Sequence, residues 1–206
     1  MLSIEETRKS LPDEYKNMPD EEVRKIRDEM DTLADLLLDI YFDKEKEEKE
    51  VFEKLLEEIK PHFKLNVDGD HGISHWRRVK RIGLHLAAGT DADWRVITLF
   101  SALHDSCRQN EHDDRGHGER AAILAVELHR KGLLLAEDKQ FELLVTACRN
   151  HSDRDFKTDD LTIQTCLNSD RLDLYRLNEV PDDKFLFGDK AKSRGTRDFV
   201  LKLLGK

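Results

Sequence analysis

Two adjacent polar side chains end an apolar stretch of the chain. The run TLFSALHDSCRQ, residues 98–109, is mostly apolar until it reaches His104 and Asp105. Imidazole nitrogen and carboxylate oxygen are ligands for divalent metal ions, and both groups also move protons in hydrolysis. A carboxylate at the C-terminal end of a helix faces the negative end of the helix dipole, which is unfavourable unless a cation compensates. The pair therefore indicates a bound metal ion.

Three further histidines stand at the ends of apolar stripes. His75 and His117 each begin a run of apolar residues spaced four, three and four apart, and His151 ends a run spaced three, four and three apart. Side chains at this spacing share one face of a helix. A single core histidine usually needs only a hydrogen bond to the backbone. Inward-facing polar groups on five successive helices, however, favour a shared site.

One carboxylate lies in the middle of an apolar stripe. Asp170 occupies the same helical face as Leu167 and Leu174. An unpaired buried carboxylate is costly, and it is expected to be protonated or bound to a cation. We therefore predict that Asp170 faces the same site as the histidines.

The available ligands limit the kind of ion. Imidazole and carboxylate groups together suit ions of intermediate hardness, namely Mn, Fe, Co, Ni or Zn. Cys107, Cys148 and Cys166 form no CxxC pair, so neither a thiolate zinc site nor a disulfide framework is indicated. Because adjacent helical residues point about 100° apart, His104 and Asp105 can share an ion only beside the end of their helix. Other helices must supply the remaining ligands.

Helices must hold these side chains in place. The 206 residues are 38% charged and 38% apolar, with only four Pro and ten Gly, a composition that favours helices joined by short loops. We expect an all-α protein whose main domain spans residues 63–206. Its five helices are predicted near residues 74–88, 91–105, 117–131, 137–151 and 160–177, followed by a short helix over 196–204.

Residues 1–62 form a different, highly charged region. Apolar residues at heptad-like spacing run from Val23 to Ile40 and again from Phe52 to Ile59, which predicts two helices. We expect a helical hairpin packed on the main domain. The alternative is an N-terminal arm that makes a homodimer or contacts a partner, because the stripe is too short for an independent coiled coil.

The overall charge excludes some partners. A net charge of −9 disfavours bulk binding of nucleic acid or of an anionic membrane, because both need a surplus of Lys and Arg. The N-terminal residues contain no apolar signal core, and no window approaches the ~20 apolar residues of a membrane-spanning helix. We expect a cytoplasmic protein.

The order of these motifs resembles the HD-domain superfamily of metal-dependent phosphohydrolases, whose signature is a His, an adjacent His-Asp pair and a distal Asp. The matching segments are GISHWRRV with His75, ALHD with His104 and Asp105, and NSDRLDLYRL with Asp170, within roughly residues 70–192. The resemblance implies an HD-domain-like helical bundle in which these four side chains bind the metal.

Two more histidines match the family, and two features depart from it. RGHGERAA with His117 and CRNHS with His151 look like extra histidines that in many members contact phosphate or hold a second metal. Some HD nucleotidases have a Glu three residues after the His-Asp pair, where this chain has Arg108. The consecutive histidines of dinuclear phosphodiesterase-type members are absent. One ion is therefore expected, and two remain open.

The resemblance implies hydrolysis of a small phosphomonoester or phosphodiester, with nucleotides among the candidate substrates, by water that the metal activates. The expected catalytic residues are Asp105, Arg78, His117 and His151. Arg115 and Arg149 each precede a site histidine by two residues and are expected to bind substrate phosphate. The alternative is a non-catalytic HD-type binding or signalling module that keeps its metal.

Overall fold

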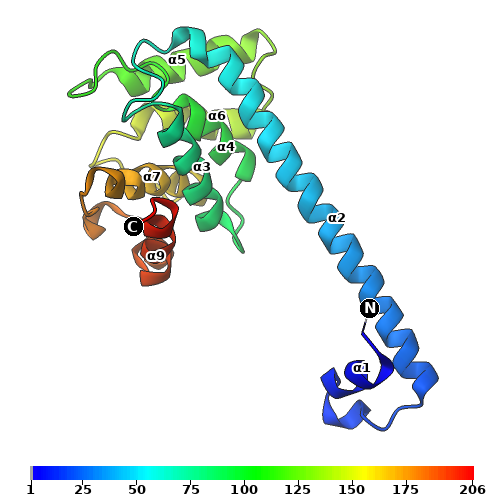
Figure 1. Ribbon diagram of the computed structural model, residues 1–206. Coiled ribbons are helices and arrows are strands. Elements are labelled where there is room, and N and C mark those ends of the chain that lie inside the picture. Colours follow the sequence, from blue (N-terminus) through cyan, green and yellow to red (C-terminus); the bar gives the residue numbers. More distant parts are fainter. Residues whose placement is uncertain (1) are drawn as a thin grey trace. The chain divides into compact units, whose positions relative to one another are not determined.

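The computed structural model describes residues 2–206, and every regular element in that range is a helix (Figure 1). The prediction of an all-α protein is confirmed. The chain divides into two compact units, Met1–Glu47 and Glu48–Lys206. Helix α2 (Asp20–Ile59) runs through the boundary between them.

The first unit holds a short N-terminal helix against the start of α2. It consists of α1 (Ile4–Ser10), the 3-10 helix η1 (Asp13–Tyr15) and the first part of α2. Arg8 of α1 donates to two carbonyl groups of the connecting loop and forms an ion pair with Asp20 at 2.5 Å. Val23 is fully buried. These contacts cover the N-terminal end of the apolar stripe on α2.

The structure differs from the hairpin predicted for residues 1–62. Both apolar stripes lie on one helix, α2, which is 40 residues long. The segment between them, DKEKEEKE at residues 43–50, contains neither Gly nor Pro, and Glu and Lys are good helix formers. Nothing in this segment ends the helix. The second stripe is buried in the core of the second unit, with Phe52 and Leu56 each 1% exposed.

Five helices build the second unit around a buried centre. They are α3 (Ile73–Ala87), α4 (Trp94–Leu103), α5 (His117–Arg130), α6 (Asp138–Asn150) and α7 (Leu161–Leu172). All residues of α4 from Val96 to Leu103 are buried, and α4 packs against α3, α6 and α7 (Figure 1). The predicted helices thus exist, although α4 begins later than predicted and ends before His104.

The remaining elements are short. They are the 3-10 helices η2 (Lys60–His62), η3 (Asp173–Leu177) and η4 (Asp183–Phe185), and the helices α8 (Gly188–Lys192) and α9 (Arg194–Leu203). Helix α9 contacts α3, where Val200 and Ile82 belong to a second, smaller core. Of the helices formed by residues 2–206, none combines the length and the apolar character needed to cross a lipid bilayer.

A glycine lets the two helices that carry the first site histidines approach closely. A Cβ atom on Gly83 of α3 would lie 2.4 Å from Cγ2 of Ile97 on α4, far inside van der Waals contact. Any larger residue at this position would push α3 away from α4. The close packing brings the beginning of α3 toward the end of α4.

Candidate metal centre

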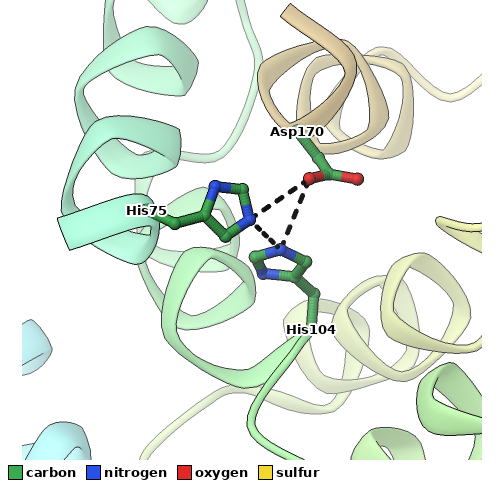
Figure 2. Close-up of side chains that lie close together, drawn as sticks. All are labelled: His75, His104 and Asp170. Atoms are coloured by element: carbon green, nitrogen blue, oxygen red, sulfur yellow. Dashed lines mark hydrogen bonds and ion pairs between the residues drawn. The ribbon is translucent and has the colours of Figure 1, made fainter. Parts of the chain in front are cut away.

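Three side chains from three helices converge inside the second unit (Figure 2). His75 lies in the first turn of α3, His104 directly follows α4, and Asp170 lies near the end of α7. The two Nε2 atoms are 3.1 Å apart, and Oδ1 of Asp170 lies 3.4 Å and 3.5 Å from them. Both histidines are fully buried. We call these three residues the first group.

Asp105 stands between the first group and a second set of ligands. Its Oδ2 atom lies 3.5 Å from Nε2 of His75 and 3.6 Å from Nε2 of His104. Its Oδ1 atom lies 3.2 Å from Nε2 of His117 and 3.5 Å from Nε2 of His151. The two oxygens of one buried carboxylate therefore face in two directions.

The second group consists of Asp105, His117 and His151. His117 is the first residue of α5, and His151 directly follows α6. Their Nε2 atoms are 2.8 Å apart. Both histidines were predicted as site residues because they stand at the ends of apolar stripes, and their side chains do lie together in the structure.

All four histidines direct an Nε2 lone pair toward the centre. In each ring, Nδ1 faces an oxygen that accepts a hydrogen bond, so Nδ1 carries the hydrogen. The acceptors are the carbonyls of Phe100 and Ser101 for His104 (3.2 Å each), the carbonyl of Asp114 for His117, the carbonyl of Cys148 for His151 (2.8 Å) and the carboxylate of Asp173 for His75 (2.7 Å). When all four rings are neutral, the Nε2 lone pairs thus face one another, and a proton or a metal ion between them would relieve their repulsion.

This arrangement fits a divalent metal ion. For metal–ligand bonds of about 2.1 Å, two ligand atoms lie about 3.0 Å apart at a right angle and about 3.4 Å apart at the tetrahedral angle. The separations within the two groups run from 2.8 to 3.5 Å. The buried groups could therefore hold an ion, and nitrogen and oxygen ligands suit the Mn to Zn series.

Neighbouring charges and burial shift the pKa values of the ligands. Burial would raise the pKa of Asp105 and Asp170, but the neighbouring histidines hold both well below the usual range. Burial would lower the pKa of His75, yet three nearby carboxylates raise it to about 10. Burial and the nearby His151 lower the pKa of His117 to about 4. A metal-free cluster would thus keep a proton on His75.

Metal binding is expected to strengthen as the pH rises. His75 has a pKa of about 10 in the metal-free fold, against an ordinary value of 6.5, so between these values the ion must displace a proton. Releasing one proton increases the apparent affinity by up to about tenfold per pH unit. Titration calorimetry in two buffers with different ionisation enthalpies should report about one proton released per ion. An affinity that does not change with pH would contradict this expectation.

Arg78 lies beside the centre without facing its ligands. Its Nε and Nη2 atoms donate to Asp173 at 2.7 and 3.0 Å. Asp173 is fully buried and accepts from Nδ1 of His75. Arg78, which the sequence predicted as catalytic, therefore contacts the carboxylate that orients His75. Asp173 itself was not predicted, although it stands three residues after Asp170 in the motif DRLD.

The structure does not bring Arg115 or Arg149 to the centre. The side chain of Arg115 is 91% exposed and lies 3.3 Å from Asp113. Arg149 points to Glu119, with Nε 2.6 Å from Oε2, and both side chains are about half exposed. Arg115 lies before the first residue of α5. Helical spacing therefore does not determine whether its side chain points in the same direction as that of His117.

Arg108 lies at the centre and His71 lies beside His75 at its edge, although the sequence did not place either residue there. Nη1 of Arg108 lies 3.4 Å from Oδ1 of Asp105 and 3.5 Å from Nε2 of His117, and the residue is 8% exposed. The ring of His71 contacts that of His75 edge-on and pairs with Glu111. For Arg108, the only signal was its position three residues after Asp105.

Gly118→Ala is expected to destabilise the fold by about 1–3 kcal/mol, because overpacking a close helix contact forces backbone shifts. A Cβ here would lie 2.7 Å from the carbonyl oxygen of Cys148, which also accepts from Nδ1 of His151. Chemical denaturation measures the loss of stability, and ion titration measures any effect on ion binding through His151. Gly89→Ala is the control, because its φ of +73° costs about 1 kcal/mol while no described atom lies within 4 Å of the new Cβ. Ion binding that is equally unchanged in both variants would contradict a link from Gly118 to His151.

Comparison with family models, with curated proteins and with solved structures found no match. The resemblance to the HD-domain superfamily therefore remains an expectation that rests on the motifs around His75, His104, Asp105 and Asp170.

Proposed function

We propose that this chain is a metal-dependent phosphohydrolase with an HD-domain-like bundle, acting on a small phosphomonoester or phosphodiester. The observation that supports this most strongly is the convergence of four imidazole lone pairs on the buried carboxylate of Asp105. A divalent ion held here would supply a Lewis acid that activates water and polarises a phosphoryl oxygen.

Four residues would hold the ion, and others would assist. His75, His104, Asp105 and Asp170 provide the ligands of the first position. The low pKa of His117 keeps its ring neutral, so its Nε2 atom can accept a hydrogen bond from water or a substrate group. Asp173 holds His75 in the tautomer that directs Nε2 inward.

The second group is proposed to bind an ion more weakly than the first. Asp105 adds a fourth ligand to the first group, whereas the second group has three, and the guanidinium of Arg108 lies 3.5 Å from one of their nitrogen atoms. A metal ion bound by the second group and the guanidinium of Arg108 would therefore repel each other. The same guanidinium provides N–H donors for an anionic substrate oxygen. One tightly bound ion together with Arg108 therefore suits a phosphate-binding centre.

Arg108→Gln is expected to change ion binding and turnover in opposite directions. Removing the positive charge should increase the affinity of the second group for an ion by about tenfold or more. Turnover should fall about 100- to 1,000-fold, as for loss of one donor to the transition state. Ion titration and phosphate release measure the two effects. Arg108→Lys keeps the charge, so the affinity of the second group for an ion should stay low. If a second ion bound equally well to both variants, the charge of Arg108 would not be what weakens its binding.

The activity can be tested directly. We would purify the protein, measure its bound metal, and assay phosphate release from nucleotides, cyclic dinucleotides and simple phosphomonoesters with each divalent ion of the Mn to Zn series. Metal-dependent release is the expected result. Stoichiometric metal with no turnover on any substrate would overturn the enzymatic proposal and favour a non-catalytic binding or signalling module. A protein that binds no metal would argue against both.

A further inference from the structure

One segment of the first unit exposes an unusual amount of apolar surface. Between residues 30 and 42 of α2, eight large apolar side chains are 52–62% exposed. They are Met30, Leu33, Leu36, Leu37, Leu38, Ile40, Tyr41 and Phe42. Soluble monomers rarely expose a contiguous apolar patch of more than a few hundred Å². Exposed apolar surface of this extent marks a candidate site for contact with another molecule.

Most of these side chains share one side of the helix. At about 100° per residue, six of the eight fall within an arc of about 140°, and Leu38 and Phe42 lie outside it. The six are Met30, Leu33, Leu36, Leu37, Ile40 and Tyr41, and we call them the apolar face. Toward the N-terminus, the same side of α2 continues to Val23, which is already buried.

The apolar face is large enough for a specific interface. Aromatic side chains carry roughly 150–250 Å² each, and on the same scale six large apolar side chains that are a little more than half exposed offer roughly 500–850 Å². Complete burial of two such faces would remove about 1,000–1,700 Å² from water, which overlaps the range of specific protein interfaces.

The opposite side of the helix indicates what kind of partner fits. Asp35 and Asp39 lie there four residues apart and are exposed, beside the exposed Leu38 and Phe42. A helix that lies on a membrane surface usually carries Lys and Arg at these positions, and anionic lipids repel aspartates. The apolar face itself contains no charge that a partner would have to match. A second apolar helix is therefore the fitting partner.

We propose that the apolar face packs against the same face of a second copy of this chain, in antiparallel orientation. The seam Met30, Leu33, Leu37 and Ile40 has the alternating spacing of three and four residues that coiled coils use. An antiparallel pair centred between Leu33 and Leu37 places Met30 against Ile40 of the second copy. Apolar residues then meet along the whole seam.

The charged end of the seam favours the antiparallel orientation. The same stripe continues C-terminally to Lys44 and Glu47. A parallel pair would bring each of these residues against its own copy, and like charges at facing positions are destabilising. The antiparallel pair separates the two copies of Lys44 by the length of the apolar face. This pairing is independent of the proposed phosphohydrolase activity.

The oligomeric state of the full chain tests the proposal, with two neighbouring leucines as a matched pair. Light scattering after gel filtration should give twice the monomer mass for the natural sequence. Leu37→Glu, in the apolar face, should give a monomer. Leu38→Glu makes the same chemical change at a site that is 52% exposed, against 57% for Leu37, but lies off the face, so it should remain dimeric. Far-ultraviolet circular dichroism and metal content should be unchanged in both variants.

Three results would overturn the proposal. In the first, the natural chain stays monomeric at high micromolar concentration. In the second, the Leu37→Glu chain remains dimeric. In the third, Leu37→Glu and Leu38→Glu dissociate the dimer equally. If the natural chain were monomeric and bound phosphatidylserine vesicles, the partner of the apolar face would be a lipid surface and not a second copy. Orientation is tested by oxidising a mixture of Met30→Cys and Ile40→Cys chains. The antiparallel pair predicts that the mixture cross-links faster than either variant alone, and the reverse result would overturn that orientation.

Discussion

Replacing Asp105 with alanine is expected to remove bound metal and to abolish metal-dependent phosphate release. The carboxylate is the one group that faces both sets of ligands, with Oδ2 toward His75 and His104 and Oδ1 toward His117 and His151. Outer partners of a metal ligand already contribute about 10- to 100-fold to affinity. Loss of the shared ligand should therefore weaken ion binding more than about 100-fold.

Two further variants sharpen this test. Asp105→Asn keeps the size of the side chain but has one carbonyl oxygen, so it can face only one group, and residual binding of a single weak ion is expected. Asp159→Ala changes an exposed aspartate and should leave metal content and turnover unchanged. Elemental analysis after dialysis, together with circular dichroism, separates loss of metal from loss of fold. Full metal retention in Asp105→Ala would show that the ion binds elsewhere.

Much of the candidate centre could be predicted because apolar spacing fixes which face of a helix turns inward. His75 and Asp170 interrupt stripes of large apolar residues, and both lie in the first group. For His104 the stripe gave the direction of the side chain, although α4 ends one residue earlier. A polar residue in a buried stripe is an anomaly that local sequence shows without any knowledge of the fold.

Residues outside regular helices were harder to predict. Arg108 follows α4 in a turn, and its guanidinium reaches Asp105 because the carbonyls of Asn110 and His112 hold it there. Arg149 lies on a helix, but it pairs with Glu119 from a neighbouring helix. Such contacts depend on how loops and helices pack in three dimensions, which spacing along the chain does not encode.

The N-terminal region shows the same distinction between local and long-range information. The helical character of residues 20–59 followed from local composition, whereas the predicted hairpin required a turn that the sequence between Ile40 and Phe52 does not contain. Glu and Lys continue the helix through this segment. The break between the two runs of apolar spacing therefore did not mark a turn, because only Gly, Pro or a competing cap would end the helix there.

Asp173→Asn is expected to weaken ion binding by the first group about 10- to 100-fold, although Asp173 contacts no ion. Its carboxylate accepts from Nδ1 of His75 at 2.7 Å and from Arg78 at 2.7 and 3.0 Å, and it is fully buried. An amide cannot accept from all these donors, because its NH₂ group must face one of them. The ring of His75 can then place its hydrogen on Nε2, which removes the lone pair that faces the ion.

Comparison with Arg78→Gln separates this orienting role from simple stabilisation. Both variants break the partly buried ion pair between Arg78 and Asp173 and should lose up to about 3–5 kcal/mol of metal-free stability, but only Asp173→Asn changes the group that accepts from Nδ1 of His75. Arg78→Gln should therefore keep its ion affinity within a few-fold. Asp183→Asn breaks an exposed pair with Arg197, also at 2.7 Å, and should cost less than about 1 kcal/mol. If ion affinity fell in proportion to stability in all three variants, Asp173 would act through packing alone. If it fell only in Asp173→Asn, the position of one hydrogen on His75 would be what the buried carboxylate controls.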